Sequence, residues 1–354
     1  MTFLLNSINN KQLKFLEIFK NLFYKNVLEW GLWQRPNKGS IMKNKFTSIV
    51  LLLLAAMIWG FAFVAQKFGG TYLSNFYLNG IRFIIGGLVL IPVYLIFEKD
   101  SKSSNKITVL SGIVAGIILF VAANLQQWGI NITGSSGKSG FLTAMYSVFV
   151  PIFALVFLRK RTGRNTWIGA IISLVGLFLI FAGDMVSKDK PFFSIFFGIN
   201  TGKNVYDTVL SVGFGDIILL LCAVAFAIHV LFIDHFSPSI SAIKFSSTQF
   251  LTAGIISLSI AIFNETITFA AFNNSLMALL YLGIMSTGVA YTLQVIGQKG
   301  AHPTVAAIVL SSESMFAVIG GLLFAGESMD ATALIGCGIM MAGIIIAQIP
   351  SRGR

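Results

Sequence analysis

Four ionisable side chains lie inside, or at the edge of, long apolar stretches of this 354-residue chain. Arg82 lies in GIRFIIGG, Lys138 follows GSSG, His229 lies in AFAIHVLF and Glu313 lies in VLSSESMF. A charged group among apolar side chains is unfavourable unless a partner compensates it. Each of the four therefore predicts either a packing role with a satisfied partner or contact with a ligand.

Arg82 and Glu313 are the main candidates. Facing a cavity, the guanidinium of Arg82 would attract an anionic or zwitterionic substrate; bonded to helix-end carbonyls, it would only lock the packing. An unpaired Glu313 would be neutral, because burial disfavours the charged form. It would then carry a coupling proton, or else it would pair with a cation. The sequence leaves these alternatives open.

Lys138 and His229 are weaker candidates. Lys138 opens an apolar stretch, so its amine can simply extend to the polar interface. His229 changes charge near neutral pH when unperturbed, although a lone histidine on an apolar helix is more often a packing residue.

Uncharged polar and aromatic residues complete the candidate set. Gln126 and Gln294 either line a cavity or hydrogen-bond between helices. Trp59 and Tyr291 either form aromatic cavity walls or contribute to ordinary packing.

The sequence offers little for catalysis or metal binding. GFGD at 213–216 is similar to the Gly-x-Gly-Asp motif of intramembrane aspartyl proteases, but the nearby second aspartate, Asp207, lies in a polar connector. There is no HExxH, no cluster of His or Cys, and no phosphate-binding glycine loop. Cys222 and Cys337 are expected as buried, reduced thiols. We therefore expect no metal, no cofactor and no enzymatic activity.

Composition defines the elements that must hold these residues. Hydrophobic residues make up 56% of the chain, charged residues only 11%, and the mean hydropathy is +0.83. A soluble protein would have about 25% charged residues. The net charge of +12 comes from basic residues between apolar segments, so nucleic-acid binding is not expected. The pattern predicts an all-α integral membrane protein embedded in a lipid bilayer.

Apolar runs long enough to cross the hydrocarbon core recur along the chain. We expect ten transmembrane helices, with Pro92 and Pro151 inside two of them. Their predicted ranges are 46–66, 76–97, 107–129, 136–158, 164–183, 214–234, 243–263, 274–296, 303–325 and 331–349.

The distribution of Lys and Arg predicts the orientation. With both termini cytoplasmic, 19 of the 25 basic residues fall on the cytoplasmic side and four outside. This excess follows the positive-inside rule and indicates a multi-pass protein of the cell membrane.

The basic extension, residues 1–45, is a separate question. Leu16, Phe19, Phe23 and Val27 share one helical face, so this segment could be an interfacial amphipathic helix. Alternatively, translation starts at Met42. No cleavage site follows a suitable apolar core, so a signal peptide is not expected.

The two halves of the chain repeat each other. Four pairs of segments match in the same order, three at an offset of 167 residues and one at 168. They are LLAAMIW (53–59) with LLCAVAF (220–226), RFIIGG (82–87) with QFLTAG (249–254), AANLQQWG (122–129) with AYTLQVIG (290–297), and Ile168, Gly169, Ile172 and Gly176 with Ile335, Gly336, Ile339 and Gly343.

Each repeat holds five predicted spans, and an odd number inverts the second repeat relative to the first. The loop before span five carries four basic residues at 159–164, whereas its counterpart before span ten carries Glu327 and Asp330. Inversion explains this reversal. We predict repeat one at 46–183, an extracytoplasmic connector at 184–213 and repeat two at 214–350.

Several segments also carry a family resemblance. They include AAMIWGFAFVAQK, NLQQWGINITGSSGKSGFLTAMYSVFVPI and SSESMFAVIGGLLFAGES. Over roughly residues 45–350 the chain resembles an EamA-type transporter of the drug/metabolite transporter superfamily. Two features depart from that pattern: Ser314 follows Glu313 where the family often has proline, and the central connector is longer.

The resemblance implies ten spans and the transport of a small metabolite or drug. Inverted repeats are typical of secondary transporters, whose substrate binds near the midplane between the repeats. We expect an exporter that works by alternating access, with spans five and ten as peripheral supports. A passive channel is the nearest alternative; an enzyme or receptor is a distant one. The expected partners are the substrate, a proton or counter-substrate, and a second copy in a homodimer.

Overall fold

A computed structural model describes residues 45–98, 105–134, 136–157, 159, 162–185, 213–324 and 331–349. The chain forms two compact units, Met1–Asn44 and Lys45–Arg354, and only the second contains described residues. The predicted amphipathic helix of the extension and most of the predicted connector lie outside them. Within the described ranges all regular structure is helical.

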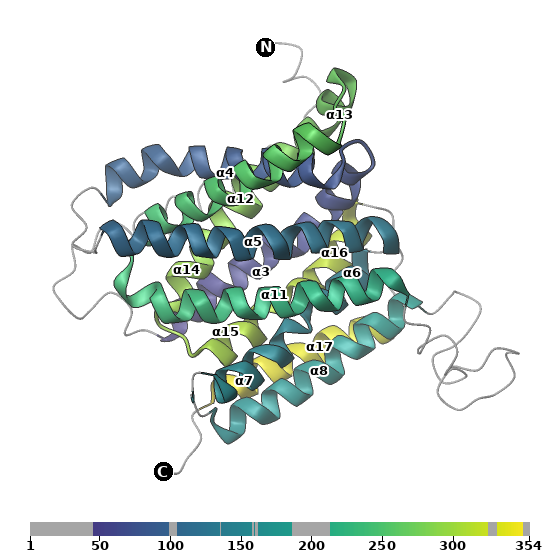
Figure 1. Ribbon diagram of the computed structural model, residues 1–354. Coiled ribbons are helices and arrows are strands. Elements are labelled where there is room, and N and C mark those ends of the chain that lie inside the picture. Colours follow the sequence, from purple (N-terminus) through teal and green to yellow (C-terminus); the bar gives the residue numbers. More distant parts are fainter. Residues whose placement is uncertain are drawn as a thin grey trace, which may run out of the picture. The chain divides into compact units, whose positions relative to one another are not determined.

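The helices follow the predicted spans closely (Figure 1). The first half contains α3 (Lys45–Gly70), α4 (Asn75–Phe97), α5 (Asn105–Thr133), α6 (Ser136–Ala144), α7 (Tyr146–Val156) and α8 (Arg164–Met185). The second half contains α11 (Phe214–Phe236), the 3-10 turn η2 (Ser237–Ser239), α12 (Ala242–Asn264), α13 (Phe269–Leu280), the π-helix η3 (Tyr281–Tyr291), α14 (Thr292–Gln298), α15 (Pro303–Leu310), α16 (Glu313–Phe324) and α17 (Ala331–Gln348).

Eight helical stretches of the described residues are long and apolar enough to cross a bilayer. Two shorter apolar stretches, Arg164–Leu179 and Leu334–Gln348, occupy the positions of the predicted fifth and tenth spans. Pro92 and Pro151 lie inside α4 and α7, as predicted. Large apolar side chains face outward from these helices, for example Phe263 at 87% exposure.

Three predicted spans differ from simple continuous helices. The fourth is divided at Met145 into α6 and α7, and the ninth is divided at Ser311 and Ser312 into α15 and α16. Hydroxyl groups stabilise both breaks: Ser147 donates to the carbonyl of Ala144, and Ser311 and Ser312 donate to carbonyls three residues earlier. The eighth span passes through the π-helix. Such interruptions are difficult to recognise in an apolar sequence.

The repeat-related helices α4 and α12 form one antiparallel pair (Figure 1). Glu98 follows α4, and its carboxylate caps the first turn of α12. It accepts hydrogen bonds from the main-chain N–H groups of Ile243 (3.0 Å) and Lys244 (3.2 Å) and from the hydroxyl of Ser241. A carboxylate is favourable there because the first N–H groups of a helix have no partner within the helix.

The opposite end of this pair carries the same arrangement. Glu265 follows α12, and its carboxylate caps the first turn of α4. It accepts from the N–H groups of Phe76 (3.3 Å) and Tyr77 (3.1 Å) and from the hydroxyl of Ser74 (2.5 Å). Glu98 and Glu265 are 167 residues apart, as are Ser74 and Ser241. Each helix is therefore capped by the end of its repeat counterpart.

The helices α8 and α17 form a second repeat-related pair at the opposite edge of the bundle from α4 and α12 (Figure 1). Their glycines allow the backbones to touch: a Cβ at Gly169 would lie 2.5 Å from the carbonyl oxygen of Gly343, and one at Gly343 would lie 2.5 Å from the nitrogen of Ser173. This pair is packed too closely to contain a cavity.

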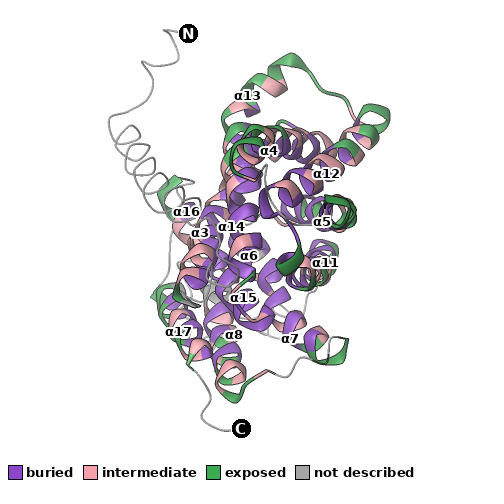
Figure 2. Cartoon of the chain, turned by 90° about the vertical axis from the view of Figure 1, so that its left-hand side faces the viewer, coloured by how far each residue is buried: buried purple, intermediate pink, exposed green. Residues whose placement is uncertain are grey.

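The buried centre lies between these two pairs. Figure 2 shows buried residues concentrated on α6, α14 and α15 in the middle of the bundle, with exposed residues on its rim. Every residue of α15 is buried. The breaks in the two divided spans therefore lie among buried residues, where the freed backbone groups can find protein partners rather than lipid.

Candidate functional site

A cavity lies in the buried centre, next to both helix breaks. The volume of the cavity is about 30 Å³. In this conformation it has room for water and not for a metabolite. Its wall consists of Trp59, Ala62, Phe63, Gln66, Arg82, Gln126, Thr143, Tyr146, Phe226, Val230, Ser286, Tyr291, Gln294, Leu310 and Glu313.

Six of the eight candidates from the sequence meet at this wall. They are Trp59, Arg82, Gln126, Tyr291, Gln294 and Glu313. They come from α3, α4, α5, η3, α14 and α16, so segments far apart in the chain converge on one space. The side chain of Lys138 is outside what the structure describes.

Arg82 points its positive charge at the cavity from the interior of α4. Its side chain is 3% exposed, and its guanidinium carbon lies 4.8 Å above the ring of Phe83. The Nε atom has no hydrogen-bond partner. No ion pair involving Arg82 occurs within the described ranges. An anionic group beside the guanidinium would supply the missing bond.

Glu313 is the first residue of α16, directly after the break in the ninth span. It is 4% exposed, and its Oε1 atom has no hydrogen-bond partner. The neighbouring Ser314 donates to the carbonyl of Gly140 at 3.1 Å, which ties this break to α6. At Glu313 a carboxyl group lies at the N-terminus of a helix and beside a cavity. Ligand sites inside membranes that are built on discontinuous helices have these features.

His229 lies next to the cavity without lining it. It is fully buried, its Nε2 atom lies 3.0 Å from Oε1 of Gln249, and its ring packs edge-on against Tyr291 at 6.0 Å. Its Nδ1 atom has no hydrogen-bond partner. The bond to Gln249 and the position behind the wall fit the packing alternative that the sequence left open.

The aromatic part of the wall is held by the π-helix. Trp59 donates from its indole nitrogen to the carbonyl of Ser286 at 3.1 Å and packs edge-on against Tyr291, with ring centroids 4.6 Å apart. Both partners belong to η3. A π-helix leaves main-chain carbonyls available to side chains and often marks a functional site.

The wall also contains polar residues that we did not select from the sequence. They are Gln66, Thr143, Tyr146 and Ser286. The repeat offset would have found one of them: Tyr146 is 167 residues before Glu313, and these two residues begin α7 and α16. The other three are common residue types that give no signal in a helix.

Asp216 has a structural role that explains the GFGD motif. It lies in the first turn of α11, and its Oδ2 atom accepts from the main-chain N–H of Gly213 at 3.1 Å. This is a capping box. Among the residues that the structure describes, no group of three or more His, Cys, Asp or Glu is suited to a metal ion. Cys222 and Cys337 are buried and unpaired with each other, as expected.

Apolar membrane-length helices around a buried polar cavity are the architecture of a membrane transporter. A family comparison agrees with it: the model of the EamA-like transporter family matches residues 46–182 and again 213–348. The chain belongs to this family. It is therefore a multi-pass membrane protein of a family of transporters, and its two matched segments are two copies of one unit.

Curated relatives extend along most of the chain. An "Uncharacterized transporter" of Archaeoglobus fulgidus is 26% identical over 300 residues, 84% of each chain. The transporter YetK of Bacillus subtilis is 24% identical, with 89% of this chain and 90% of the relative covered. A protein of Chlamydia muridarum named "S-adenosylmethionine/S-adenosylhomocysteine transporter" is 23% identical, with 84% and 90% covered.

A solved structure has the same fold. It superposes with a TM-score of 0.64 and 16% identity, and covers 85% of this chain and 96% of its own. At this identity the likeness concerns the fold alone.

Proposed function

We propose that the chain is a secondary transporter that moves a small zwitterionic metabolite through the central cavity, by alternating access between two inverted repeats. The observation that carries the proposal is the makeup of the cavity wall. Four pairs of wall residues are related by the offset of 167: Trp59 with Phe226, Phe63 with Val230, Thr143 with Leu310, and Tyr146 with Glu313. Gln126 and Gln294 are related by 168.

Such pairs of wall residues are expected when the cavity lies on the axis that relates the first repeat to the second. The antiparallel course of α4 and α12, each capped by the other's glutamate, supports an axis in the membrane plane and ten spans in opposite orientations. Two repeats with the same fold can then exchange conformations, so that the cavity opens first to one side of the membrane and then to the other.

The charges of the wall favour a zwitterion. Arg82 supplies a buried cation for a carboxylate, and the N-terminus of α7 adds the positive end of a helix dipole at Tyr146. Glu313 supplies an acidic group for an amine or another cation. Trp59, Tyr146 and Tyr291 add aromatic faces for a flat or cationic group. Transport of S-adenosylmethionine, the molecule named for the Chlamydia relative, would use all of these features.

Direction and coupling complete the proposal. We assign export to the chain, across the cell membrane, with both termini in the cytoplasm as the distribution of basic residues predicts. Glu313 accepts a proton in exchange for the substrate cation. The narrow cavity fits a conformer between the two open states, because its water-sized space excludes a metabolite until the halves separate.

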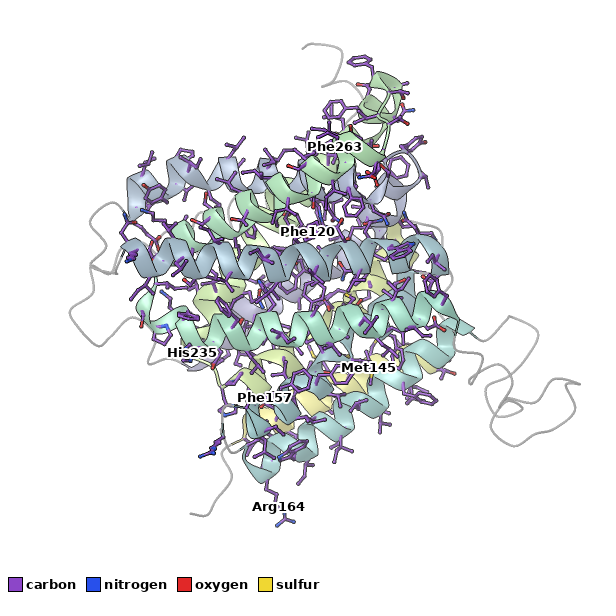
Figure 3. The ribbon with its side chains drawn as sticks, in the orientation of Figure 1. Phe120, Met145, Phe157, Arg164, His235 and Phe263 are labelled. Atoms are coloured by element: carbon purple, nitrogen blue, oxygen red, sulfur yellow. The ribbon has the colours of Figure 1, made fainter. Side chains whose placement is uncertain are left out.

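Binding and flux test the proposal together. Purified protein would be screened by thermal shift against S-adenosylmethionine, amino acids, nucleosides and cationic drugs. The compound that stabilises it would then be followed in proteoliposomes. We expect a zwitterion to bind and Arg82→Ala to abolish its transport while membrane insertion stays normal. Arg164→Ala removes an equal charge from an exposed site at the end of α8 (Figure 3) and should leave flux unchanged.

Preloading distinguishes a carrier from a passive channel. In a carrier, substrate on the far side accelerates uptake of labelled substrate, because the loaded form returns. Absence of this acceleration would support a channel, and normal flux through Arg82→Ala would refute the role of the cavity charge.

A further inference from the structure

A hydrogen-bonded row, formed by the main-chain carbonyl of Gln66 and the amide side chains of three further residues, leads from the cavity toward one face of the bundle. Gln66 lines the cavity, and its main-chain carbonyl accepts from Nε2 of Gln127 at 3.3 Å. The same Nε2 atom donates to Oδ1 of Asn131 at 2.9 Å, and Nδ2 of Asn131 donates to Oδ1 of Asn75 at 2.8 Å. We call Gln66, Gln127, Asn131 and Asn75 the amide row. It begins at a buried residue and ends at the exposed Asn131 and the half-buried Asn75.

The buried members of the row have unused acceptors. Gln66 is 3% exposed and Gln127 is fully buried, yet Oε1 of each has no hydrogen-bond partner. A buried amide oxygen without a partner costs about 1–3 kcal/mol. Two such oxygens in succession, next to a cavity, indicate that water or a passing polar ligand completes their hydrogen bonds.

Close packing holds the row in place at its outer end. Gly70 ends α3 beside it, and a Cβ there would lie 2.6 Å from Oδ1 of Asn131 and 2.9 Å from Nε2 of Gln127. The absence of a side chain at Gly70 is what leaves space for the two amides.

The corresponding described span of the second repeat forms no such continuous row. At the offset of 168 that aligns AANLQQWG with AYTLQVIG, Gln127 corresponds to Val295 and Asn131 to Lys299, so neither amide is repeated; the nearest amides on α14 are Gln294 and Gln298. Gln294 lines the cavity and Gln298 follows one turn later, and Oε1 of each also has no hydrogen-bond partner. The difference lies at the outer end: Gln298 is 2% exposed and donates from Nε2 to the carbonyl of Val230 at 3.0 Å, whereas the amide row ends at the exposed Asn131. The buried side chain of Leu52 lies beside Gly297, the residue before Gln298. Gln298, the last amide residue on α14, is therefore buried and does not reach the surface.

We propose that the amide row is the polar passage between the cavity and the membrane face where α3 ends and α4 begins, with Gln127 as its narrowest point. Uncharged amides offer donors and acceptors to water and to a polar substrate without retaining an ion. In the orientation proposed above this face is extracellular, so the passage is the exit of an exporter. The inference rests on the proposed function for its direction, although a hydrated path can be tested without any substrate.

Cysteine accessibility tests the passage in intact cells. The membrane-impermeant reagent would be an anionic methanethiosulfonate, added from outside. The variants would be Gln127→Cys, Asn131→Cys and the matched control Trp128→Cys. Trp128 neighbours Gln127 on α5 but is 45% exposed on the outer surface of the bundle. The unsubstituted protein provides the background, because Cys222 and Cys337 are buried.

If the passage is hydrated, the cysteine at the buried position 127 should react faster than the one at the exposed position 128. Burial alone predicts the opposite order. Gln127→Cys should react at least about tenfold faster than Trp128→Cys, since the reactive thiolate forms only where water reaches. Asn131→Cys should react faster still. An unreactive Gln127→Cys in a protein whose Asn131→Cys reacts would overturn the proposal, as would labelling from the cytoplasmic side only.

Gly70→Val provides a second variant that leaves the amides themselves intact. Its side chain would occupy the space that the row uses, so labelling of Gln127→Cys should fall to background while the protein still inserts. Unchanged labelling would contradict the passage. If labelling behaves as expected but Arg82→Ala transports normally, the passage stands and the proposed function fails.

Discussion

At the outer ends of α4 and α12, the two halves of the bundle carry the same side chains. Ser74 and Glu98 in the first half correspond to Ser241 and Glu265 in the second, and each glutamate bonds the same pair of main-chain N–H groups in the other helix. At the cavity the corresponding positions differ. Arg82 lines the cavity, whereas its counterpart Gln249 lies behind the wall and bonds His229.

The two helix breaks show the same contrast. Both open a helix at the cavity wall, but α7 begins with Tyr146 and α16 with Glu313. Repetition is therefore preserved where it holds the helices together. At the cavity wall the pair Gln126 and Gln294 is kept, but the charged residues Arg82 and Glu313 have no charged counterparts. A symmetric cavity wall would present groups of the same charge to both ends of a substrate. The observed wall is asymmetric and presents one cation, Arg82, and one acid, Glu313.

The largest effect is expected from replacing Glu313, the acidic wall residue whose repeat counterpart is not acidic. Glu313→Gln keeps the size of the side chain but removes its ability to exchange a proton. Transport should lose its dependence on a pH gradient, and net export should fall by about one to two orders of magnitude, as expected for loss of a charge-assisted contact of about 1.5–3 kcal/mol. Flux in proteoliposomes with and without an imposed gradient would measure both.

The matched control is the counterpart of Glu313. Tyr146→Phe removes a hydroxyl that interacts with the Glu313 carboxyl but leaves the acid itself in place, so gradient dependence should remain. A gradient-dependent Glu313→Gln protein would exclude proton carriage by this residue, and equal behaviour of the two variants would remove the functional contrast between the two breaks.

A smaller effect, on stability alone, is expected where α8 meets α17. A methyl group at Gly343 would lie 2.5 Å from the main-chain nitrogen of Ser173, so Gly343→Ala must push two backbones apart. Overpacking of this kind destabilises by about 1–3 kcal/mol. Thermal unfolding in detergent should begin at a lower temperature, while the transport rate of the folded protein stays normal.

Gly338 provides the control on the same helix. A Cβ there would have no atom within 4 Å, so Gly338→Ala should leave the unfolding temperature unchanged or raise it. Loss of transport in a folded Gly343→Ala protein would contradict the view that this pair is only a support.

These residues also indicate how far the sequence could predict the structure. The repeat offset and the lengths of the apolar runs predicted helices near their observed positions, because hydrophobicity and membrane thickness decide where a span lies. Ionisable residues were found for the same reason: Arg82 and Glu313 are conspicuous in an apolar segment, and both line the cavity.

Other parts of the site left no comparable signal. Contacts across helices decide which backbone carbonyls find partners. They therefore decide where the fourth span breaks at Met145, where the π-helix forms, and that Gln66 lies at the cavity wall. The cap by Glu98 depends on contact with residues more than 140 positions later. Such information is tertiary, so a single sequence predicts the spans and the candidate charges but not how the interior is connected.

The smallest effect, and the most direct test of the preserved ends, comes from the two capping glutamates. Replacing a capping side chain by alanine typically lowers stability by about 0.5–2 kcal/mol. Glu98→Ala and Glu265→Ala should each reduce the unfolding temperature, and by similar amounts, because each removes an equivalent set of hydrogen bonds. The double variant should approach the sum of the two, since the caps lie at opposite ends of the pair and share no partner. A loss confined to one glutamate would mean that the two ends have already diverged, and that the conserved repetition extends less far than the contacts indicate.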